Sequence, residues 1–357
     1  MFNNFFRNKS IIITGHTGFK GSWLTFWLSI LGAKINGVSL KHSYLSKKIN
    51  NNSKIKNNFF NIEDKKKLEK LIKKIEPDII FHLAAQAIVA DSYRYPFKTW
   101  SSNTVGMLNL MESLKVIKKK CSVIIITSDK VYKNIEQKKG YKEDDILHGL
   151  DPYSASKSCA DILAQSYINS ILCNNTNINF GIARAGNVIG GGDFSNNRII
   201  PDLIKSSKIK KKLILRQPNS TRPWQHVIEI IYGYLTLSKY LYLNKKCNLE
   251  ILNFGPKKNF TFKVIDIVKE AKKYISFDYK VYQSKSNFKE SILLKLNSSR
   301  AYNKIGWKSV LGFRDTIKYT MEWYKISFSN LSKDIKKITN HQINKYYKKN
   351  KIKINEI

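Results

Sequence analysis

The stretch SIIITGHTGFKGSWL, residues 10–24, decides the fold. A β-branched run, SIIIT, precedes a glycine loop, and a helix-forming segment follows it. Gly15, Gly18 and Gly21 have GxxGxxG spacing: the first permits a tight turn, the second lets the backbone approach a pyrophosphate, and the third allows close helix packing. The helix N-terminus offers free N–H groups to phosphates. Because the strand and helix that such a motif requires flank the loop, we favour dinucleotide binding over a plain turn.

The same alternation continues to about residue 184, as in parallel βαβ units. The predicted strands are SIIIT, KINGVSL, DIIFHLAA, SVIIITS and NFGIARAG. Helices are predicted over residues 22–31, 65–75, 99–119 and 153–173. Strands this apolar are covered on both faces, so the predicted fold class is α/β with a doubly wound parallel sheet. Active sites in such sheets form beyond the carboxyl ends of the strands.

The pattern changes after Gly186, where glycines and prolines cluster in GNVIGGGD, IIPDL and QPNSTRPWQH. Further helices are predicted over residues 227–243, 264–274 and 313–324. We interpret residues 1–185 as the dinucleotide-binding domain and residues 186–327 as a smaller mixed α/β substrate lobe, with residues of about 226–256 returning to the first domain. Residues 328–357 form a Lys- and Asn-rich tail, which we expect to be a solvated helix or disordered.

Composition excludes several classes of function. The net charge of +37 comes from 63 Lys and Arg against 26 Asp and Glu, but the excess Lys is spread along all 357 residues without interleaved aromatics, so we predict no nucleic-acid partner. Cys121, Cys159, Cys173 and Cys247 are scattered and are expected to be reduced, mostly core residues. The six histidines form no ligand pair, so no metal site is predicted. Without a signal peptide or a membrane-length apolar run, a cytoplasmic location is expected, with no membrane partner.

Two motifs carry candidate chemistry. In DPYSASKSCAD, Tyr153 and Lys157 are one helical turn apart. A lysine cation beside a phenol stabilises phenolate and lowers its pKa from about 10, which makes Tyr153 a candidate base for oxidation of a hydroxyl. The second motif is TSDKVY, residues 127–132, where Asp129 and Lys130 follow an apolar strand. An exposed ion pair at the strand end is the alternative interpretation.

Several stretches together resemble the extended short-chain dehydrogenases/reductases, and in particular their nucleotide-sugar 4,6-dehydratases: TGHTGFKGSWL, HLAAQ, TSDKVY, DPYSASK, RAGNVIGGGD and TRPWQHV. The likeness covers about residues 8–323. It implies a Rossmann fold, an NAD cofactor, a nucleotide-sugar substrate, and a homodimer or homotetramer whose seam is formed by the helices that begin near Thr99 and Tyr153.

In this family, the dehydratases resemble the epimerases but carry an acid and a base after the Ser or Thr that follows the fourth sheet strand. The cytidine branch has Asp-Lys, as here, so the resemblance matches Ser128 to the orienting hydroxyl, Asp129 to the acid and Lys130 to the base. The implied reaction oxidises C4 of the sugar, eliminates water across C5 and C6, and returns hydride to C6. It requires the pKa of Lys130 to fall and that of Asp129 to rise, and the strand must end and turn for both to reach one sugar.

The resemblance also implies binding residues. For the cofactor these are Gly15, Thr17, Gly18, Phe19, Gly21, Asp64, Ala84, Ala85, Gln86, Asn103, Tyr153 and Lys157. For the substrate they are Asn187, Arg198, Arg216 and Arg222. Arginine suits a diphosphate, but Arg198 and Arg216 could equally be surface cations.

Two choices stay open from the residues alone. The acid expected after the second strand is missing, and Leu40, Lys41 and His42 stand there, so NADP is not excluded, while Asp64 could bind the adenine amino group. The alternatives for function are a nucleotide-sugar 4-epimerase, a 4,6-dehydratase for another nucleotide, or a non-catalytic dinucleotide-binding module. The choice of cytidine rests on resemblance.

Overall fold

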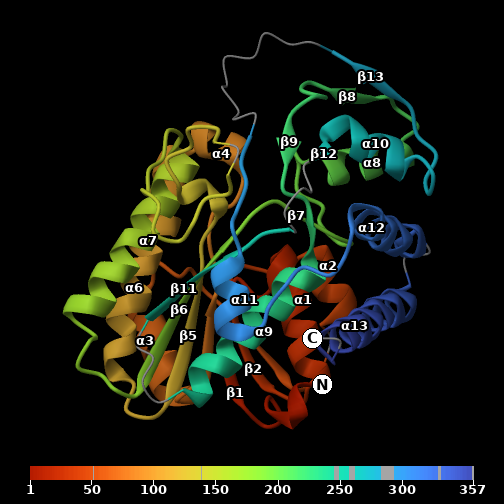
Figure 1. Cartoon of the computed structure of the whole chain (residues 1–357). Helices are drawn as coiled ribbons and strands as arrows, with labels where there is room; N and C mark the ends of the chain where they lie inside the picture. Colours follow the sequence, from red (N-terminus) through yellow and green to blue (C-terminus); the bar gives the residue numbers. More distant parts are fainter. Residues whose placement is uncertain are drawn as a thin grey trace.

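The computed structural model describes the chain except residues 51, 138, 245–248, 257–261, 283–292, 329–330 and 356–357. Its first lobe is built on a seven-stranded parallel sheet in the order β11-β6-β5-β4-β1-β2-β3 (Figure 1). The strands are β1 (Ser10–Thr14), β2 (Lys34–Ser39), β3 (Ile55–Phe59), β4 (Ile79–His82), β5 (Cys121–Ile126), β6 (Ile178–Ala185) and β11 (Leu249–Phe254). The strand order reverses beside β1, which is where ligands bind in doubly wound sheets. The predicted fold class is confirmed.

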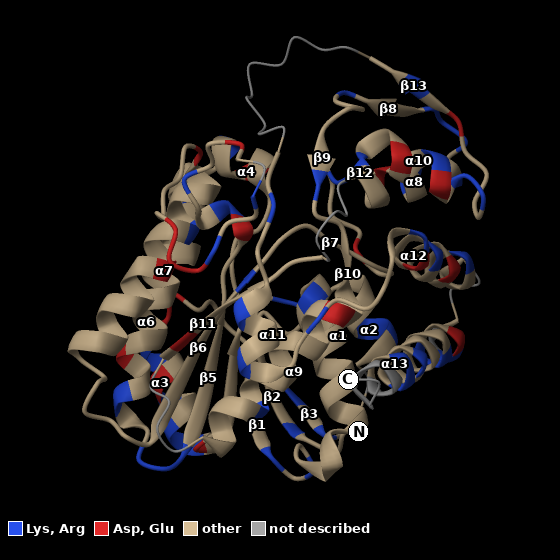
Figure 2. Cartoon of the chain, viewed as in Figure 1, with Lys and Arg blue, Asp and Glu red and all other residues tan. Residues whose placement is uncertain are grey.

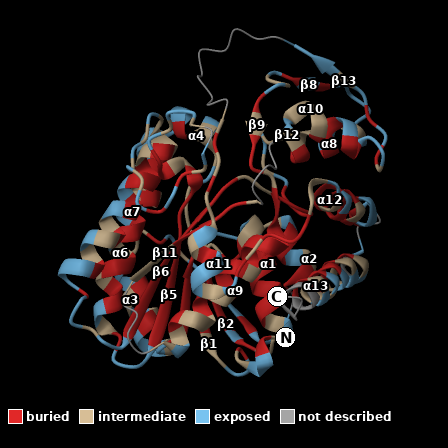
Figure 3. Ribbon diagram, viewed as in Figure 1, coloured by how far each residue is buried: buried red, intermediate tan, exposed pale blue. Residues whose placement is uncertain are grey.

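Helices cover both faces of this sheet because successive strand residues point to opposite sides. Ile11 and Ile13 of β1 pack with α1 (Phe19–Ile30) and α9 (Val227–Leu243). Ile12 packs into the opposite core, together with the helices of the other face. Those helices are α3 (Lys65–Ile75), α6 (Gly106–Ser113) and α7 (Pro152–Ser170). The buried residues accordingly concentrate in the sheet and on the inner sides of the helices (Figure 3).

The helix predicted over residues 99–119 is not continuous. The chain instead forms α5 (Pro96–Trp100), a π-helical turn η2 (Ser101–Val105), α6 and a 3-10 turn η3 (Leu114–Val116). Asn103 lies inside the π-helical turn and is buried. Such turns insert one extra residue into a helix and are frequent at functional sites. Hydrophobic spacing gives little signal for such a turn, because one added residue displaces the apolar pattern by a single position.

The second lobe consists of short strand pairs and helices above the carboxyl edge of the sheet (Figure 1). The pairs are β7 (Val188–Ile189) with β10 (Gln225–His226), β9 (Thr221–Arg222) with β12 (Phe262–Lys263), and β8 (Leu213–Leu215) with β13 (Tyr279–Val281). The helices are α8 (Ile199–Lys208), α10 (Val264–Ala271) and α12 (Phe313–Ser327). Within this part of the sequence, α9, β11 and α11 (Ser299–Ile305) join the first lobe: β11 pairs with β6, α9 packs on β5 and β6, and α11 packs on β11 and α9. Three further short helices are η1 (Phe2–Asn4), α2 (Tyr44–Ile49) and α4 (Val89–Arg94).

The C-terminal tail differs from the expectation of a solvated helix or disorder. It forms α13 (Ser332–Asn355), in which Ile335, Ile343 and Tyr346 are fully buried. The Tyr346 ring packs edge-on against Trp27 of α1 with centroids 6.4 Å apart. These apolar residues recur at helical spacing, so one face of α13 packs on the protein although its composition is polar.

The cysteines agree only in part with the prediction from composition. Cys121 is buried, but Cys159 and Cys173 are exposed, so the expectation of mostly core cysteines is wrong for these two; Cys247 lies outside the described residues.

Lys and Arg are spread over both lobes and do not gather on one face in this view (Figure 2). Within the described ranges, no cluster of three or more His, Cys, Asp or Glu could hold a metal ion. None of the described helices combines the length and hydrophobicity that crossing a membrane requires.

Candidate active site

The glycine loop packs as tightly as its spacing predicted. Gly15 has a φ of +74°, and a Cβ there would lie 2.8 Å from the backbone nitrogen of Ala84. A Cβ on Gly21 would lie 2.0 Å from the carbonyl oxygen of Gly15, so α1 can approach the loop only because this residue is glycine. Gly18 is the N-cap of α1 and supplies no capping side chain. The first turn of α1 therefore keeps backbone donors available for an anion.

Thr17 and the end of β2 form the next wall of the loop. The Thr17 hydroxyl donates to the carbonyl of Lys41 at 2.7 Å, and the Thr17 backbone nitrogen donates to Ser39 Oγ at 3.3 Å. His16 is buried between Ser39 Oγ at 3.0 Å and Asn57 Oδ1 at 2.8 Å. Burial lowers the pKa of His16. These polar groups stand where the sequence lacks the expected acid.

Asp64 follows β3 and begins the next helix. It caps α3, where its carboxylate accepts from the Lys67 backbone nitrogen at 3.1 Å and pairs with Lys67 Nζ at 2.9 Å. The capping hydrogen bond is the ordinary function of an aspartate at this position. Contact of Asp64 with adenine stays a prediction.

The loop after β4 is held by Asn103. Its Oδ1 accepts from the Gln86 backbone nitrogen at 2.8 Å, and its Nδ2 donates to the Gln86 carbonyl at 3.1 Å and to Ser156 Oγ at 2.9 Å. The side chain thereby joins this loop to α7. Ala84 and Ala85 are half-buried at the start of the same loop, where Ala84 lies beside Gly15. Phe19, at the start of α1, is half-buried and packs on Gly190 of the second lobe.

The strand that leads to Asp129 ends where the proposed chemistry requires a turn. β5 stops at Ile126, and a 3-10 turn η4 (Asp129–Val131) follows. Ser128 Oγ accepts from the Lys130 backbone nitrogen at 3.2 Å and donates to Asp129 Oδ1 at 3.0 Å. Asp129 is 2% exposed, whereas Lys130 is half-buried. The turn therefore places an enclosed carboxyl next to a more accessible amine.

Burial raises the pKa of Asp129, although Lys130, Ser128, Lys20 and Arg222 act in the opposite direction. The direction is the one that a proton-donating carboxyl needs. Among the described residues, none forms a hydrogen bond with its Oδ2 atom. A carboxyl with one unpaired buried oxygen is accommodated at lower cost when it is protonated.

The Tyr153 and Lys157 pair differs from the expectation in one respect. Burial raises the pKa of Tyr153, and the facing Ser128 and Arg198 only partly oppose this effect. Lys157 is not among the groups that act on this pKa in the protein alone, so the lowering of the Tyr153 pKa by Lys157 stays a prediction for the loaded site. Lys157 Nζ instead donates to the Ile126 carbonyl at 2.9 Å, and burial lowers the pKa of Lys157 to about 8.

Sequence reasoning missed Lys20, which lies inside the glycine motif at the start of α1. Burial, and then the neighbouring cations Arg198 and Lys157, lower the pKa of Lys20 to about 8, while Asp129 and Asp193 raise it. Lys20 thus stands among the charges of the site. Its place in the motif is visible in the sequence, but its charged neighbours are not, because they come from other segments of the chain.

The predicted substrate residues divide into two groups. Arg198 donates to Asp193 Oδ2 at 2.9 Å and to the carbonyl of Ala87 at 3.3 Å, so it links the second lobe to the loop after β4. Arg222 is buried and acts on the charge of Asp129. Asn187 is half-buried, and its carbonyl accepts from the Gln225 backbone nitrogen at 3.1 Å.

Arg216 stands apart from these residues. It is exposed after β8, and the carboxylate on which its charge acts is Asp202. The structure therefore brings Arg198 and Arg222 to the candidate site and leaves Arg216 on the surface of the second lobe.

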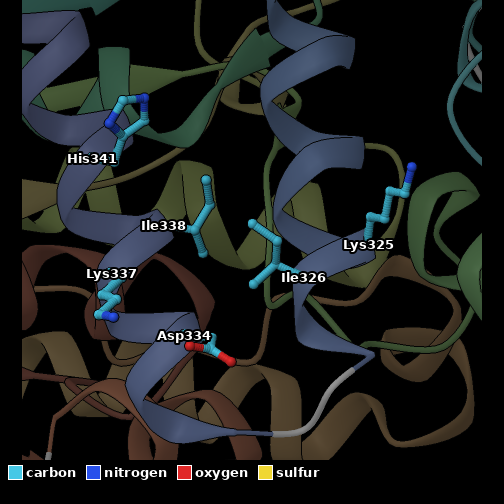
Figure 4. A pocket seen from close by; sticks show the side chains of 6 residues that line it. All are labelled: Lys325, Ile326, Asp334, Lys337, Ile338 and His341. Atoms are coloured by element: carbon cyan, nitrogen blue, oxygen red, sulfur yellow. The ribbon is translucent and has the colours of Figure 1, made fainter.

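A cavity of about 440 Å³ lies elsewhere, between α12 and α13 (Figure 4). It is lined by Lys325, Ile326, Asp334, Lys337, Ile338 and His341. None of these residues belongs to the glycine loop, the η4 turn or α7. The cavity is therefore not part of the candidate active site.

Comparisons with known proteins agree with this geometry. The model of the GDP-mannose 4,6 dehydratase family matches residues 12–320. The chain is similar to CDP-glucose 4,6-dehydratase of Salmonella typhimurium, with 37% identity over 330 residues, which are 90% of this chain and 92% of the relative. It also resembles the solved structure of an epimerase from Methanothermobacter thermautotrophicus, with a TM-score of 0.79 and 20% identity over 92% of this chain and 96% of that one. A dTDP-glucose 4,6-dehydratase from Bacillus anthracis in complex with NAD gives a TM-score of 0.74 and 19% identity over 91% of this chain and 99% of that one.

Proposed function

The chain belongs to the GDP-mannose 4,6 dehydratase family, and from this premise we propose that it is an NAD-dependent enzyme that converts CDP-glucose to CDP-4-dehydro-6-deoxyglucose and water. The similarity to a CDP-glucose 4,6-dehydratase over most of both chains supports the choice of substrate. The single observation that carries the reaction type is the buried Asp129 beside Lys130, on a turn that docks against the helix of Tyr153 and Lys157.

The glycine loop fits NAD on its own geometry. Gly15 and Gly21 leave room where side chains would clash, and α1 begins without a capping side chain. In our proposal, this helix N-terminus holds the pyrophosphate, with Thr17 and Ser39 beside the adenosine half. NAD supplies the acceptor for a hydride from C4 and the donor of the hydride that returns to C6.

In this proposal, the proton transfers of the reaction are carried out by different residues of the chain. Tyr153 accepts the proton of the C4 hydroxyl, and Ser128 orients that hydroxyl. The resulting ketone acidifies the C5 proton, which Lys130 removes as its C–H bond breaks. Asp129 gives its proton to the departing C6 hydroxyl, which leaves as water, and Lys130 returns a proton to C5 once C6 has received its hydride. Two groups of opposite character on one turn let the C5 proton and the C6 oxygen leave together.

Arginine suits a diphosphate because its planar fork of donors matches phosphate oxygens. We therefore assign the diphosphate to Arg222 and Arg198 and give Asn187 a contact with the sugar or phosphates. Arg222 is buried and acts on the charge of Asp129, which supports a place for it in the substrate site. Arg216, which is exposed, receives no such support from its surroundings.

We propose in addition that the protein is a homodimer through the face of α4, α5, α6 and α7. This face exposes large apolar side chains that a monomer would leave in water. Phe97 is 85% exposed, and Ile162 on the adjoining helix α7 is 50% exposed. The further exposed members on this face are Tyr93, Tyr95, Trp100, Val105 and Leu108.

The test is to incubate the purified protein with NAD and, separately, with CDP-, dTDP-, UDP- and GDP-hexoses. We expect a 4-keto-6-deoxy product, detected by its absorbance in alkali and by NMR, from CDP-glucose in preference to the others. A product that keeps its 6-hydroxyl and differs only at C4 would identify a 4-epimerase instead. Binding of NAD without any turnover would identify a non-catalytic module.

A further inference from the structure

A buried ion pair lies behind the catalytic turn and has no part in the chemistry described above. Asp161 of α7 and Arg184 of β6 are 0% and 1% exposed. Arg184 Nε donates to Asp161 Oδ2 at 2.9 Å, and Arg184 Nη2 donates to Asp161 Oδ1 at 2.8 Å. This bidentate geometry fixes the orientation of both side chains.

The pair reaches both ends of the segment that carries the candidate acid and base. Thr127 Oγ1 donates to Asp161 Oδ2 at 2.9 Å, directly before Ser128. Arg184 Nη1 donates to the Tyr132 hydroxyl at 2.9 Å, directly after Val131. One partner of the ion pair therefore holds the beginning of the segment, and the other holds its end.

The same helix that supplies Asp161 makes two further contacts with this segment. Lys157 Nζ donates to the carbonyl of Ile126 at 2.9 Å, and Ser158 Oγ donates to the carbonyl of Val131 at 2.9 Å. Lys157 and Asp161 are four residues apart and lie on one face of α7. These contacts fix the position of the turn relative to α7, which also carries Tyr153, the candidate base for the C4 hydroxyl.

A buried ion pair is weak support for stability alone, because desolvation offsets much of its attraction. Here the strong acceptors and donors are used further: Asp161 Oδ1 also accepts from Gln165 at 2.7 Å, and Arg184 Nη1 also donates to the carbonyl of Glu143 at 2.7 Å. Compared with apolar packing, such a network also fixes the orientation of the groups that it joins. Elimination needs an acid and a base to be placed within a fraction of an ångström, and a misplacement of about 1 Å can cost about 100-fold in rate.

We propose that Asp161 and Arg184 are positioning residues for the elimination step, which hold the turn of Asp129 and Lys130 against α7. The proposal rests on the dehydratase function proposed above. Oxidation at C4 depends on Tyr153 and Lys157, which α7 carries itself, and on Ser128, which orients the C4 hydroxyl from the beginning of the turn. Detaching the turn therefore slows elimination, which needs both Asp129 and Lys130, more than it slows the first hydride transfer.

The variant that tests this is Thr127→Val combined with Tyr132→Phe. It removes the two hydroxyls through which the pair holds the turn, while Asp161 and Arg184 keep each other as partners, so no buried charge is left unpaired. The matched control is Thr320→Val combined with Tyr346→Phe, which removes two similarly buried hydroxyls far from the turn. Thr320 bonds only its own helix, at Thr316, and within the described residues the Tyr346 hydroxyl has no hydrogen-bond partner.

Hydride transfer is followed by NADH absorbance in a single turnover with CDP-glucose, and elimination by deuterium entering C5 of the product in D₂O. In the double variant we expect elimination to slow by about 10- to 100-fold and hydride transfer to slow by a clearly smaller factor, since Ser128 moves with the turn, so that NADH accumulates. The control should show neither change. Each single variant is measured in the same way. If the double variant does not fold, the two single variants still test the proposal, with a smaller expected difference between the slowing of elimination and the slowing of hydride transfer.

Equal slowing of both steps, or no slowing of elimination, in a folded variant would overturn the positioning role. A different result separates the two proposals: if the unsubstituted protein makes no 4-keto-6-deoxy product from any hexose nucleotide, the dehydratase function itself fails, whatever the variants do.

Discussion

The carboxyl group of Asp129 occupies an unusual position for a charged residue. A Cβ placed on Gly186 would lie 3.1 Å from its Oδ2 and 2.9 Å from Pro223 Cγ. Glycine at this position therefore leaves just enough room for the carboxyl and the proline beside it. The close packing excludes water from one side of Asp129, which is the physical origin of its raised pKa.

This raised pKa predicts a pH-dependent cost in stability. The unfolded chain releases the Asp129 proton near pH 4, whereas the folded protein retains it to higher pH, so the free energy of unfolding falls as pH rises from about 4 to the folded pKa. The fall is about 1.4 kcal/mol for each pH unit that separates the folded from the unfolded pKa. Asp129→Asn removes this titration, so we expect its thermal midpoint to exceed that of the unsubstituted protein at pH 8 and to approach it at pH 4. A constant difference at all pH values would contradict the assignment.

Lys130 gives the second test at this scale. Lys130→Ala should lower the rate of elimination by about 10²- to 10⁴-fold, because a positioned base is lost, and leave single-turnover reduction of NAD measurable. The control is Lys133→Ala, three residues further on and exposed, which should leave both rates unchanged. Equal loss of hydride transfer and elimination in a folded Lys130→Ala protein would remove the assigned role.

The approach of α1 to the glycine loop is a property of the element as a whole. Gly21→Ala places a methyl group 2.0 Å from the Gly15 carbonyl oxygen, so α1 and the loop must separate. Overpacking of this kind costs about 1–3 kcal/mol, and we expect NAD to bind about tenfold or more weakly by isothermal calorimetry. Gly312→Ala is the control: this residue caps α12 with open space around it, so NAD affinity should not change.

The prediction from sequence succeeded where a local pattern determines the element. α3 and α9 begin and end at the expected residues: α3 has regular apolar spacing, and α9 is a long and mostly buried apolar run. The Asp161 and Arg184 pair left no such signal, since the two residues meet only when α7 packs on β6. The same holds for Lys20, whose charged neighbours come from other segments of the chain. Contacts between elements, and the pKa values that follow from them, therefore could not be predicted from the sequence.

At the scale of the whole molecule, the apolar face of α4 to α7 predicts association. Phe97→Glu combined with Ile162→Glu places charges in the proposed seam, and we expect the mass in light scattering to fall from that of a dimer to that of a monomer. Ile214→Glu, on β8 of the second lobe, introduces the same charge at a residue of similar exposure and should stay dimeric. An unsubstituted protein that is already monomeric would refute the seam.

The last helix lies against the first residues of the chain. The backbone nitrogen of Phe2 donates to the Tyr347 hydroxyl at 2.9 Å across 345 positions of sequence, and the Tyr346 ring packs on Trp27. During translation, the aromatic surface of α1 is therefore made about 320 residues before α13, the helix that covers it. Until α13 is made, this apolar surface is exposed and can form non-native contacts. We therefore expect the nascent chain to need chaperones until its synthesis is nearly finished.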